Sequence, residues 1–297
     1  MKRYGLFLGC NMPAIRPDVE RAIRLTMPGL GVELTDLDGS ACCPAFGTFP
    51  SADEIAGLSV TGWNLAIAEE KGVDPLVECG SCYSSLRMGR DCLLTNSDKK
   101  VKVNDLLKVT GKHFEGTVEP RHLIDVLYNE VGTEKIAGLI SKKLKGINAV
   151  IQYPCHTLWP HEVVGFDNAK RPTMLRELVE ALGANVQSYS REYQCCGGAG
   201  GFARGARIDA RNYTEKKLNA IVTETKADMI VVSCITCLMH LDAMQKELNE
   251  AVNSNKYEIP VFDYNQVLAL CMGFEPKEVA SISIISRDRL VERIMAL

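Results

Sequence analysis

The chain has 297 residues and a formal net charge of −3, with 46% hydrophobic and 24% charged residues. This is ordinary globular composition, which excludes a wholly disordered chain, and the length fits one large domain or two modest ones. The near-neutral charge also excludes the broad basic surface of a general nucleic-acid binder. The unusual number is twelve cysteines against five histidines. That content is too sparse for a small disulfide scaffold, and in a cytosolic enzyme it indicates metal binding.

We expect neither a signal peptide nor a membrane span. The apolar stretch at the N-terminus, Tyr4 to Leu8, is shorter than the apolar region of a signal peptide. The longest later apolar run, Met229 to Met239, is about half of the ~20 residues that a membrane helix needs. The sequence therefore predicts a cytoplasmic protein. In that reducing compartment, clustered thiols are more often metal ligands or redox groups than structural bridges.

Strand-like and helix-like segments alternate along the chain. Short aliphatic runs before Cys10, Cys79, Cys155 and Cys234 are typical of buried strands. The predicted helices, in chain order, are Pro17–Leu25, Asp53–Lys71, Tyr83–Leu94, Pro172–Leu182, Asp209–Lys226, Leu238–Ala251 and Ser286–Leu297. This alternation predicts an α/β fold with mostly parallel sheets. Sites in parallel sheets collect at the carboxyl ends of the strands, where these four cysteines fall.

Ten of the twelve cysteines follow one pattern twice: a single cysteine, then an adjacent pair, then a CxxC. The first set is Cys10, Cys42, Cys43, Cys79 and Cys82, and the second set is Cys155, Cys195, Cys196, Cys234 and Cys237. Matching cysteines are offset by 145, 153, 153, 155 and 155 residues, which indicates an internal duplication of domain size. We predict two duplicated domains, over 1–145 and 146–297. The more polar, helix-rich segment 99–145 is interpreted as the connection between them.

Five thiols per half is an unusual ligand number. A structural zinc ion and a cubane iron–sulfur cluster each take four ligands, and adjacent cysteines do not easily occupy two vertices of one tetrahedral site. The fifth cysteine is either a spare residue or a ligand of a larger cluster bridged by the pair. Spacing alone leaves zinc, a cubane cluster and another kind of cluster open. Each CxxC lies between a strand and a helix, where backbone N–H groups and the positive helix end favour thiolate over thiol.

The cysteine motifs resemble those of the CCG family of cysteine-rich domains. The second half carries QCCGGAGG over 194–201 and SCITC over 233–237, and the first half carries CCPAFG over 42–47 and CGSC over 79–82. Pro44 replaces the glycine that follows the pair in the second half, but all five cysteines remain. A chain that consists of two such domains is similar to the B subunits of heterodisulfide reductases from methanogenic archaea. The similarity covers essentially the whole chain.

This resemblance implies an oxidoreductase with two noncubane [4Fe-4S] clusters, one held by each cysteine set and facing each other across the domain interface. The implied reaction reduces the mixed disulfide of coenzyme M and coenzyme B to two thiols, a step of methanogenesis. The implied partners are a ferredoxin-like C subunit and a flavin-bearing A subunit, with a hydrogenase or formate dehydrogenase as electron source. Similar domains also occur in thiol–fumarate reductases, glycolate oxidases and lactate-utilisation proteins.

A few residues outside the cysteine sets carry further predictions. His156 is either the proton donor to the thiolate products or a structural histidine beside the cluster, and His240 is interpreted as structural. The glycine-rich run 197–201 is interpreted as allowing close approach of the chain to the cluster, in preference to phosphate binding. Cys92 and Cys271 are predicted to be buried small hydrophobes. Basic residues beside the second motif are interpreted as solvated charges, with contact to the substrate's anionic groups as the alternative; they are Lys170, Arg171, Arg204 and Arg207.

Two other classes of function are compatible with the spacing. One is a zinc-stapled assembly or binding protein without redox chemistry. The other is a dithiol oxidoreductase that uses its two CxxC motifs directly, although this leaves the repeated Cys-Cys pairs unexplained. Iron content and the survival of activity after metal removal distinguish the three hypotheses.

Overall fold

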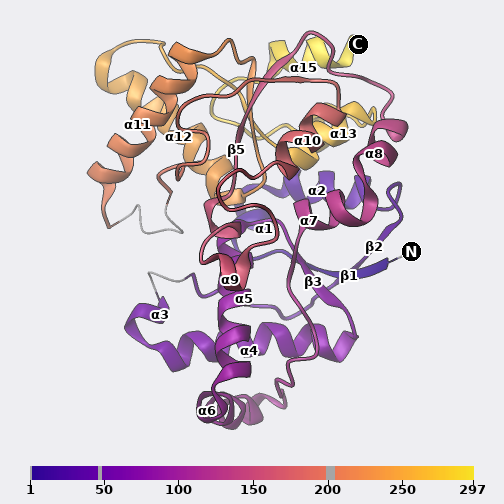
Figure 1. Cartoon of the computed structure of the whole chain (residues 1–297), viewed down its shortest axis with the longest axis vertical. Helices are drawn as coiled ribbons and strands as arrows, with labels where there is room; N and C mark the ends of the chain where they lie inside the picture. Colours follow the sequence, from indigo (N-terminus) through magenta and orange to yellow (C-terminus); the bar gives the residue numbers. More distant parts are fainter. Residues whose placement is uncertain (1, 46–48, 199–204) are drawn as a thin grey trace.

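The computed structural model describes residues 2–45, 49–198 and 205–297 and contains two α/β halves (Figure 1). Each half has a four-stranded sheet in which all strands are parallel. The strand order is β2-β1-β3-β4 in the first sheet and β6-β5-β7-β8 in the second. The same order in both sheets confirms the predicted duplicated α/β fold.

The strands are short and mostly buried. Those of the first sheet are β1 (Lys2–Phe7), β2 (Val32–Asp36), β3 (Asp74–Val77) and β4 (Arg121–His122). Those of the second are β5 (Asn148–Gln152), β6 (Asn185–Val186), β7 (Met229–Val232) and β8 (Val261–Asp263). Every residue of β7 and β8 is buried, which is typical of parallel strands whose sheet is covered by other elements.

The helices of the first half are α1 (Asn11–Ile15), α2 (Pro17–Thr26), α3 (Phe49–Ala52), α4 (Glu54–Lys71), α5 (Gly80–Thr95) and α6 (Ser97–Leu107). Of these, α2, α4 and α5 lie where the sequence predicts helices, and α6 overlaps the segment predicted to be helix-rich. The short helices α1 and α3 were not predicted. Local chemistry fixes both ends of α4. The Asp53 carboxylate accepts a hydrogen bond from Ala56 N–H at the start, and Gly72 adopts a left-handed conformation (φ 63°) at the end.

The segment between the two sheets contains several short helical elements. They are η1 (Lys108–Thr110), α7 (Leu123–Asp125), η2 (Val126–Val131) and α8 (Thr133–Leu139). This part of the chain is more than a connection, because β4 pairs with β3 and so completes the first sheet. Val103 on α6 and Phe114 after it are fully buried in the core.

The second half repeats the arrangement with its own helices. They are η3 (Cys155–Thr157), α9 (His161–Val164), α10 (Met174–Ala181), α11 (Arg207–Glu224), α12 (Ile235–Val252), α13 (Tyr264–Cys271), α14 (Pro276–Val279) and α15 (Asp288–Met295). The helices α4 and α11 occupy equivalent places in the two halves and have the same length of 18 residues. None of the helices among the described residues is long and apolar enough to cross a membrane.

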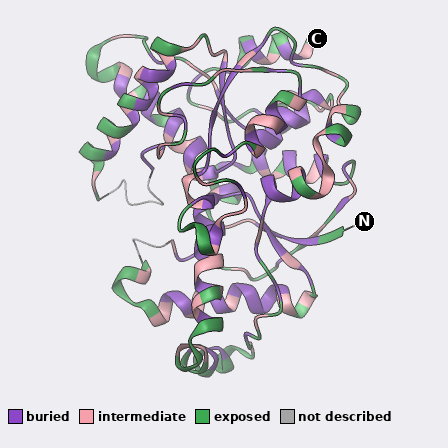
Figure 2. Ribbon diagram, viewed as in Figure 1, coloured by how far each residue is buried: buried purple, intermediate pink, exposed green. Residues whose placement is uncertain are grey.

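The two halves pack against each other reciprocally. Helix α2 of the first half packs on α13 of the second, and α10 of the second half packs on α7, η2 and α8. These helices gather on one side of the molecule in Figure 1, and Figure 2 shows that each carries buried residues, beside intermediate and exposed ones. A single cluster of buried apolar side chains runs through both halves. The relative position of the two cysteine sets is therefore fixed by a packed core.

Candidate functional site

The carboxyl ends of the parallel strands bring each cysteine set to one edge of its sheet. Cys10 follows β1 and Cys155 follows β5. Cys79 is the N-cap residue of α5 after β3, and Cys234 is the N-cap residue of α12 after β7. The adjacent pairs lie in the loops that follow β2 and β6. This is the location predicted from the sequence pattern.

The first set forms a chain of neighbouring thiols, none of which is in a disulfide. The sulfurs of Cys43 and Cys82 are 2.9 Å apart. Cys42 interacts with both Cys43 and Cys10, and Cys79 interacts with Cys82. Cys10 and Cys42 are exposed, whereas the other three are buried. The first set is thus open to solvent on one side.

The second set is built in the same way but is more enclosed. Cys155 interacts with Cys195, Cys195 with Cys196, and Cys237 with both Cys196 and Cys234. Cys196, Cys234 and Cys237 are buried, whereas Cys155 and Cys195 are half-buried. All five line one small cavity together with Gly80, Ser81, Pro154, His156 and Thr236.

Backbone groups of the glycine-rich run point at the second set. Gly197 N–H donates to the Cys195 sulfur over 3.3 Å, and Gly198 N–H donates to the Cys196 sulfur over 3.4 Å. Gly197 has φ +100°, and a Cβ there would lie 2.2 Å from Thr214 Oγ1. Only glycine fits such a position, which supports the interpretation of close approach. The remaining glycines of the run, 200 and 201, lie outside the described residues.

The two sets meet at the centre of the molecule. The sulfurs of Cys79 and Cys234, which are equivalent residues of the two repeats, are 3.9 Å apart. The residues that precede them also interact, since Ser233 Oγ donates to both carboxylate oxygens of Glu78 over 3.1 and 3.2 Å. Equivalent residues in contact place a local twofold axis between the CxxC motifs. The sequence pattern predicted two sites, and the family resemblance implied that they face each other at the domain interface, but neither predicted this contact.

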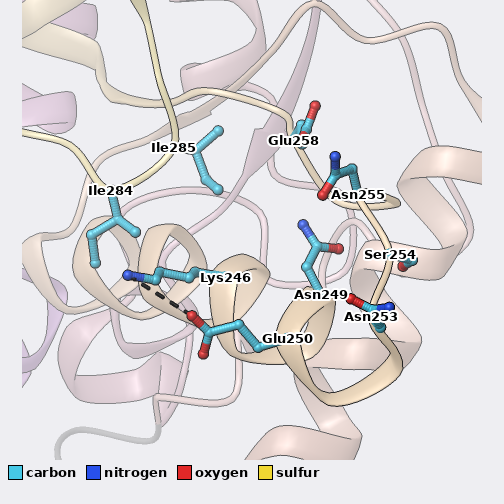
Figure 3. A pocket seen from close by; sticks show the side chains of 9 residues that line it. All are labelled: Lys246, Asn249, Glu250, Asn253, Ser254, Asn255, Glu258, Ile284 and Ile285. Carbon is cyan, nitrogen blue, oxygen red and sulfur yellow. Dashed lines mark ion pairs between the residues drawn. The ribbon is translucent and has the colours of Figure 1, made fainter.

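A cavity of about 670 Å³ opens between the halves over the first set. All five cysteines of the first set line it, as do Thr236, Met239 and His240 from α12 of the second half. A different hollow lies at the end of α12, where Lys246 forms an ion pair with Glu250 and Ile284 and Ile285 form one wall (Figure 3). It has no cysteine in its lining. Of these two hollows, the cavity over the first set is therefore the one that suits thiol or disulfide chemistry.

Contacts between neighbouring thiols lower the pKa of some cysteines and raise the pKa of others. A contact with Cys234 and one with Cys82 lower the pKa of Cys79, and a contact with Cys42 lowers the pKa of Cys43 to about 5. The pKa of Cys82 is raised by its contact with Cys43 and by burial. The contact with Cys195 raises the pKa of Cys196 to about 12. Ionising neighbouring thiols together is opposed by repulsion between the thiolates, and a bound cation relieves this repulsion in thiolate–metal sites.

The donor set is large enough for an iron–sulfur cluster in each half. A zinc ion takes four ligands around one tetrahedral centre, whereas a cluster spreads its thiolate ligands around several metal atoms. Five neighbouring thiols per half, supported by N–H donors, match the second requirement.

The histidines next to the second set occupy different environments. His156 lines the small cavity, and burial lowers its pKa while the Cys195 and Cys79 sulfurs raise it. His240 Nε2 is 2.8 Å from Thr214 Oγ1, which agrees with a structural role, yet its side chain also lines the larger cavity. Sequence reasoning did not identify Ser81, Thr236 and Met239 as cavity residues. Their positions within or next to the CxxC motifs, at the start of a helix, could have identified them as cavity residues.

Among the described residues, the remaining predicted ones do not line the cavities of the two cysteine sets. Lys170 and Arg171 are exposed, and Arg207 is exposed and paired with Glu247. Arg204 is outside the described residues. Cys271 is fully buried on α13, and burial raises its pKa to about 12. Cys92 is half-buried and packs against the core.

Comparison with known proteins agrees with this arrangement. The CCG family, described as a cysteine-rich domain, matches residues 4–87 and 149–242, which include the two cysteine sets. The chain belongs to this family.

Individual relatives cover almost the whole chain. It is 43% identical to a protein of Archaeoglobus profundus that is described as like the B subunit of heterodisulfide reductase, over 99% of both chains. It is 35% identical to the B subunit of a ferredoxin/F(420)H(2)-dependent CoB-CoM heterodisulfide reductase of Methanosarcina acetivorans, over 94% of this chain and 92% of that one. It is 28% identical to an 8-methylmenaquinol:fumarate reductase membrane anchor subunit of Wolinella succinogenes, over 94% of this chain and 95% of that one. The chain is thus a homologue of heterodisulfide reductase B subunits.

Proposed function

We propose that this chain is the catalytic B subunit of a heterodisulfide reductase. It reduces the mixed disulfide of coenzyme M and coenzyme B to two thiols and holds two noncubane [4Fe-4S] clusters. The first cluster is held by Cys10, Cys42, Cys43, Cys79 and Cys82, and the second by Cys155, Cys195, Cys196, Cys234 and Cys237. The observation that carries this proposal is the contact between two five-cysteine sets beside an open cavity, with 3.9 Å between the Cys79 and Cys234 sulfurs.

The reaction needs two electrons and two protons for each disulfide that is broken. When bound, the clusters supply the electrons and iron sites that hold the product thiolates. The protein's part is to admit the disulfide into the cavity over the first set, between the exposed Cys10 and Cys42 on one side and Thr236 and His240 on the other. Cys79 lines this cavity and contacts Cys234 of the second set, so a disulfide bound there lies beside the contact between the two sets.

Anaerobic purification followed by metal analysis and a substrate assay tests this function. We expect a brown protein with about eight irons per chain, four for each proposed cluster, and reduction of the coenzyme M–coenzyme B disulfide by a low-potential donor. A colourless protein that holds two zinc ions would overturn the proposal. Activity that survives complete iron removal would instead favour direct dithiol exchange through the CxxC motifs.

The 28% identity to a fumarate reductase subunit gives the second candidate, an iron–sulfur subunit of a related oxidoreductase. The same preparation can be assayed with fumarate, glycolate and lactate in place of the disulfide. Turnover of one of these, with no reduction of the disulfide, would establish the second candidate and reject the first.

We propose His156 as the proton donor to one thiolate product. It lines the cavity of the second set and lies close enough to Cys195 and Cys79 for their sulfurs to affect its pKa. Substituting His156→Gln should lower turnover by about 10²-fold, since general acids typically contribute that much or more, while about eight irons are retained. The exposed His113 serves as a matched control, and His113→Gln should leave turnover unchanged. Full turnover in His156→Gln would show that this histidine is structural.

The proposed partners are a ferredoxin-like C subunit and a flavin-bearing A subunit, with a hydrogenase or formate dehydrogenase as donor. The names of the relatives, which are subunits of larger enzymes, support a multi-subunit assembly. Co-purification of the native complex from its source, with identification of its components by mass spectrometry, tests this assembly. Isolation of an active chain without any partner would contradict it.

A further inference from the structure

Helices α4 and α11 are equivalent elements of the two halves, and their residues can be matched one to one. Both have 18 residues, and both begin eleven residues after the second cysteine of the adjacent pair. The offset of 153 residues, the same as that of the pairs, aligns Thr61 with Thr214 and Leu65 with Leu218. The same offset aligns Asn64 with Lys217, so a neutral amide and an ammonium group occupy one position of the repeat.

Both side chains form hydrogen bonds with the loop that precedes a cysteine pair. Asn64 is buried, and its Oδ1 accepts a hydrogen bond from Ala41 N–H over 2.8 Å, directly before the first pair. Lys217 is 1% exposed. It donates to Tyr189 Oη over 3.2 Å and to the carbonyls of Arg191 and Glu192, just before the second pair. Each residue fixes the loop that presents a Cys-Cys pair, but only the second adds a charge.

The cysteines with the largest electrostatic effect on Lys217 all belong to the second set. It is the only buried lysine among the described residues. Burial lowers its pKa to about 8, and the sulfurs of Cys196, Cys237, Cys195 and Cys155 raise it. The buried arginines, Arg16 and Arg287, belong to a different network around Asp18. Lys217 thus places a buried amino group, held by the Tyr189 hydroxyl and the carbonyls of Arg191 and Glu192, against the loop that leads to the second pair.

We propose that Lys217 is a positioning and charge-tuning residue that raises the reduction potential of the second cluster above that of the first. This inference rests on the proposed function, because it requires a cluster at each cysteine set. Adding an electron makes a cluster more negative, and a buried positive charge nearby stabilises that state more than an amide does. The electron is therefore held preferentially at the second set, and the two halves of the duplicated fold have unequal roles.

Neutral substitutions of Lys217 in the loaded chain test the inference by redox titration, followed by absorbance and electron paramagnetic resonance. In Lys217→Gln and Lys217→Met, the higher of the two midpoint potentials, that of the second cluster, should fall. At a fixed solution potential, the ratio of reduced to oxidised second cluster should then decrease at least tenfold. This corresponds to about 59 mV for a one-electron couple. The other potential should stay constant. Lys217→Arg should retain the wild-type value, and the neighbouring exposed lysine on α11 provides the matched control Lys216→Gln.

The reciprocal substitution tests the same idea in the first half. Asn64→Lys should raise the lower potential and narrow the gap between the two clusters. Iron content is measured in every variant, because a purely structural role for Lys217 predicts loss of about four irons with no change in the remaining potential. That result, or two unchanged potentials in Lys217→Met with all iron present, would overturn this inference and leave the proposed function intact. A wild-type chain that binds no iron would overturn both.

Discussion

Substituting Cys196→Ala is expected to remove one of the two clusters, lowering the iron content from about eight to about four per chain. Cys196 is buried, contacts both Cys195 and Cys237, and receives a backbone N–H from Gly198. Loss of a group that orients a metal ligand typically costs 10- to 100-fold in activity, and loss of the ligand itself should cost more. We therefore expect disulfide reduction to fall by more than about 100-fold, measured with metal analysis on the same sample.

Cys271 provides the control for this substitution. It lies in the same half and is equally buried, but it stands on α13 outside the repeated pattern. Cys271→Ala should keep about eight irons and full activity. It should cost only about 1 kcal/mol of stability, the central value for single substitutions. Equal iron contents in the two variants would refute the assignment of Cys196 as a ligand.

The sequence predicts the location of the site well because the relevant chemistry is local. A cysteine after an aliphatic run, or between such a run and a helix, lies at the carboxyl end of a strand whatever the rest of the chain does. Cys10, Cys79, Cys155 and Cys234 all occupy such places. The repeated spacing adds that the two halves share one topology, which both sheets confirm.

The features that could not be predicted depend on how distant segments pack. The strand β4 has only two residues, which are too few to show the alternation of side chains that predicts a strand. It forms because it pairs with the edge of β3. The contact between Cys79 and Cys234 depends on the crossed packing of α2 with α13 and of α10 with α8. Lys217 lies on a helix with many polar residues, where a lysine is usually solvated, and only the structure shows that it is buried.

The second large effect that we expect concerns the buried ionic network between the halves. The Arg16 guanidinium donates two hydrogen bonds, each of 3.1 Å, to the Asp18 carboxylate at the start of α2. Gln266 on α13 donates to the same carboxylate over 2.6 Å, and Arg287 lies 3.8 Å from it. The carboxylate of Asp18 is thus the shared ion-pair partner of two arginines, both nearly fully buried.

Substituting Asp18→Asn keeps the shape of the side chain but removes the carboxylate with which both guanidinium groups form ion pairs. Asp263 then remains as the buried carboxylate that still interacts electrostatically with both arginines. Breaking one side of a buried pair typically costs 3–5 kcal/mol, so the free energy of unfolding in urea should fall by about that amount. The matched control is Glu278→Gln, because Arg21 and Glu278 also join α2 to the second half but are about half exposed. That variant should lose at most about 1 kcal/mol.

The two variants also separate the stability of the halves from the stability of their interface. Because α2 follows directly on Cys10 and α1, loosening it should disturb the first cysteine set before the second. We therefore expect Asp18→Asn to lose iron from the first set at lower urea concentration than the wild type does, while the second set keeps its iron until global unfolding. A loss below about 1 kcal/mol, or simultaneous release of all the iron, would show that apolar packing alone holds the halves together. In that case, the buried arginines would have to be stabilised by their carbonyl contacts, such as that of Arg287 with Val261.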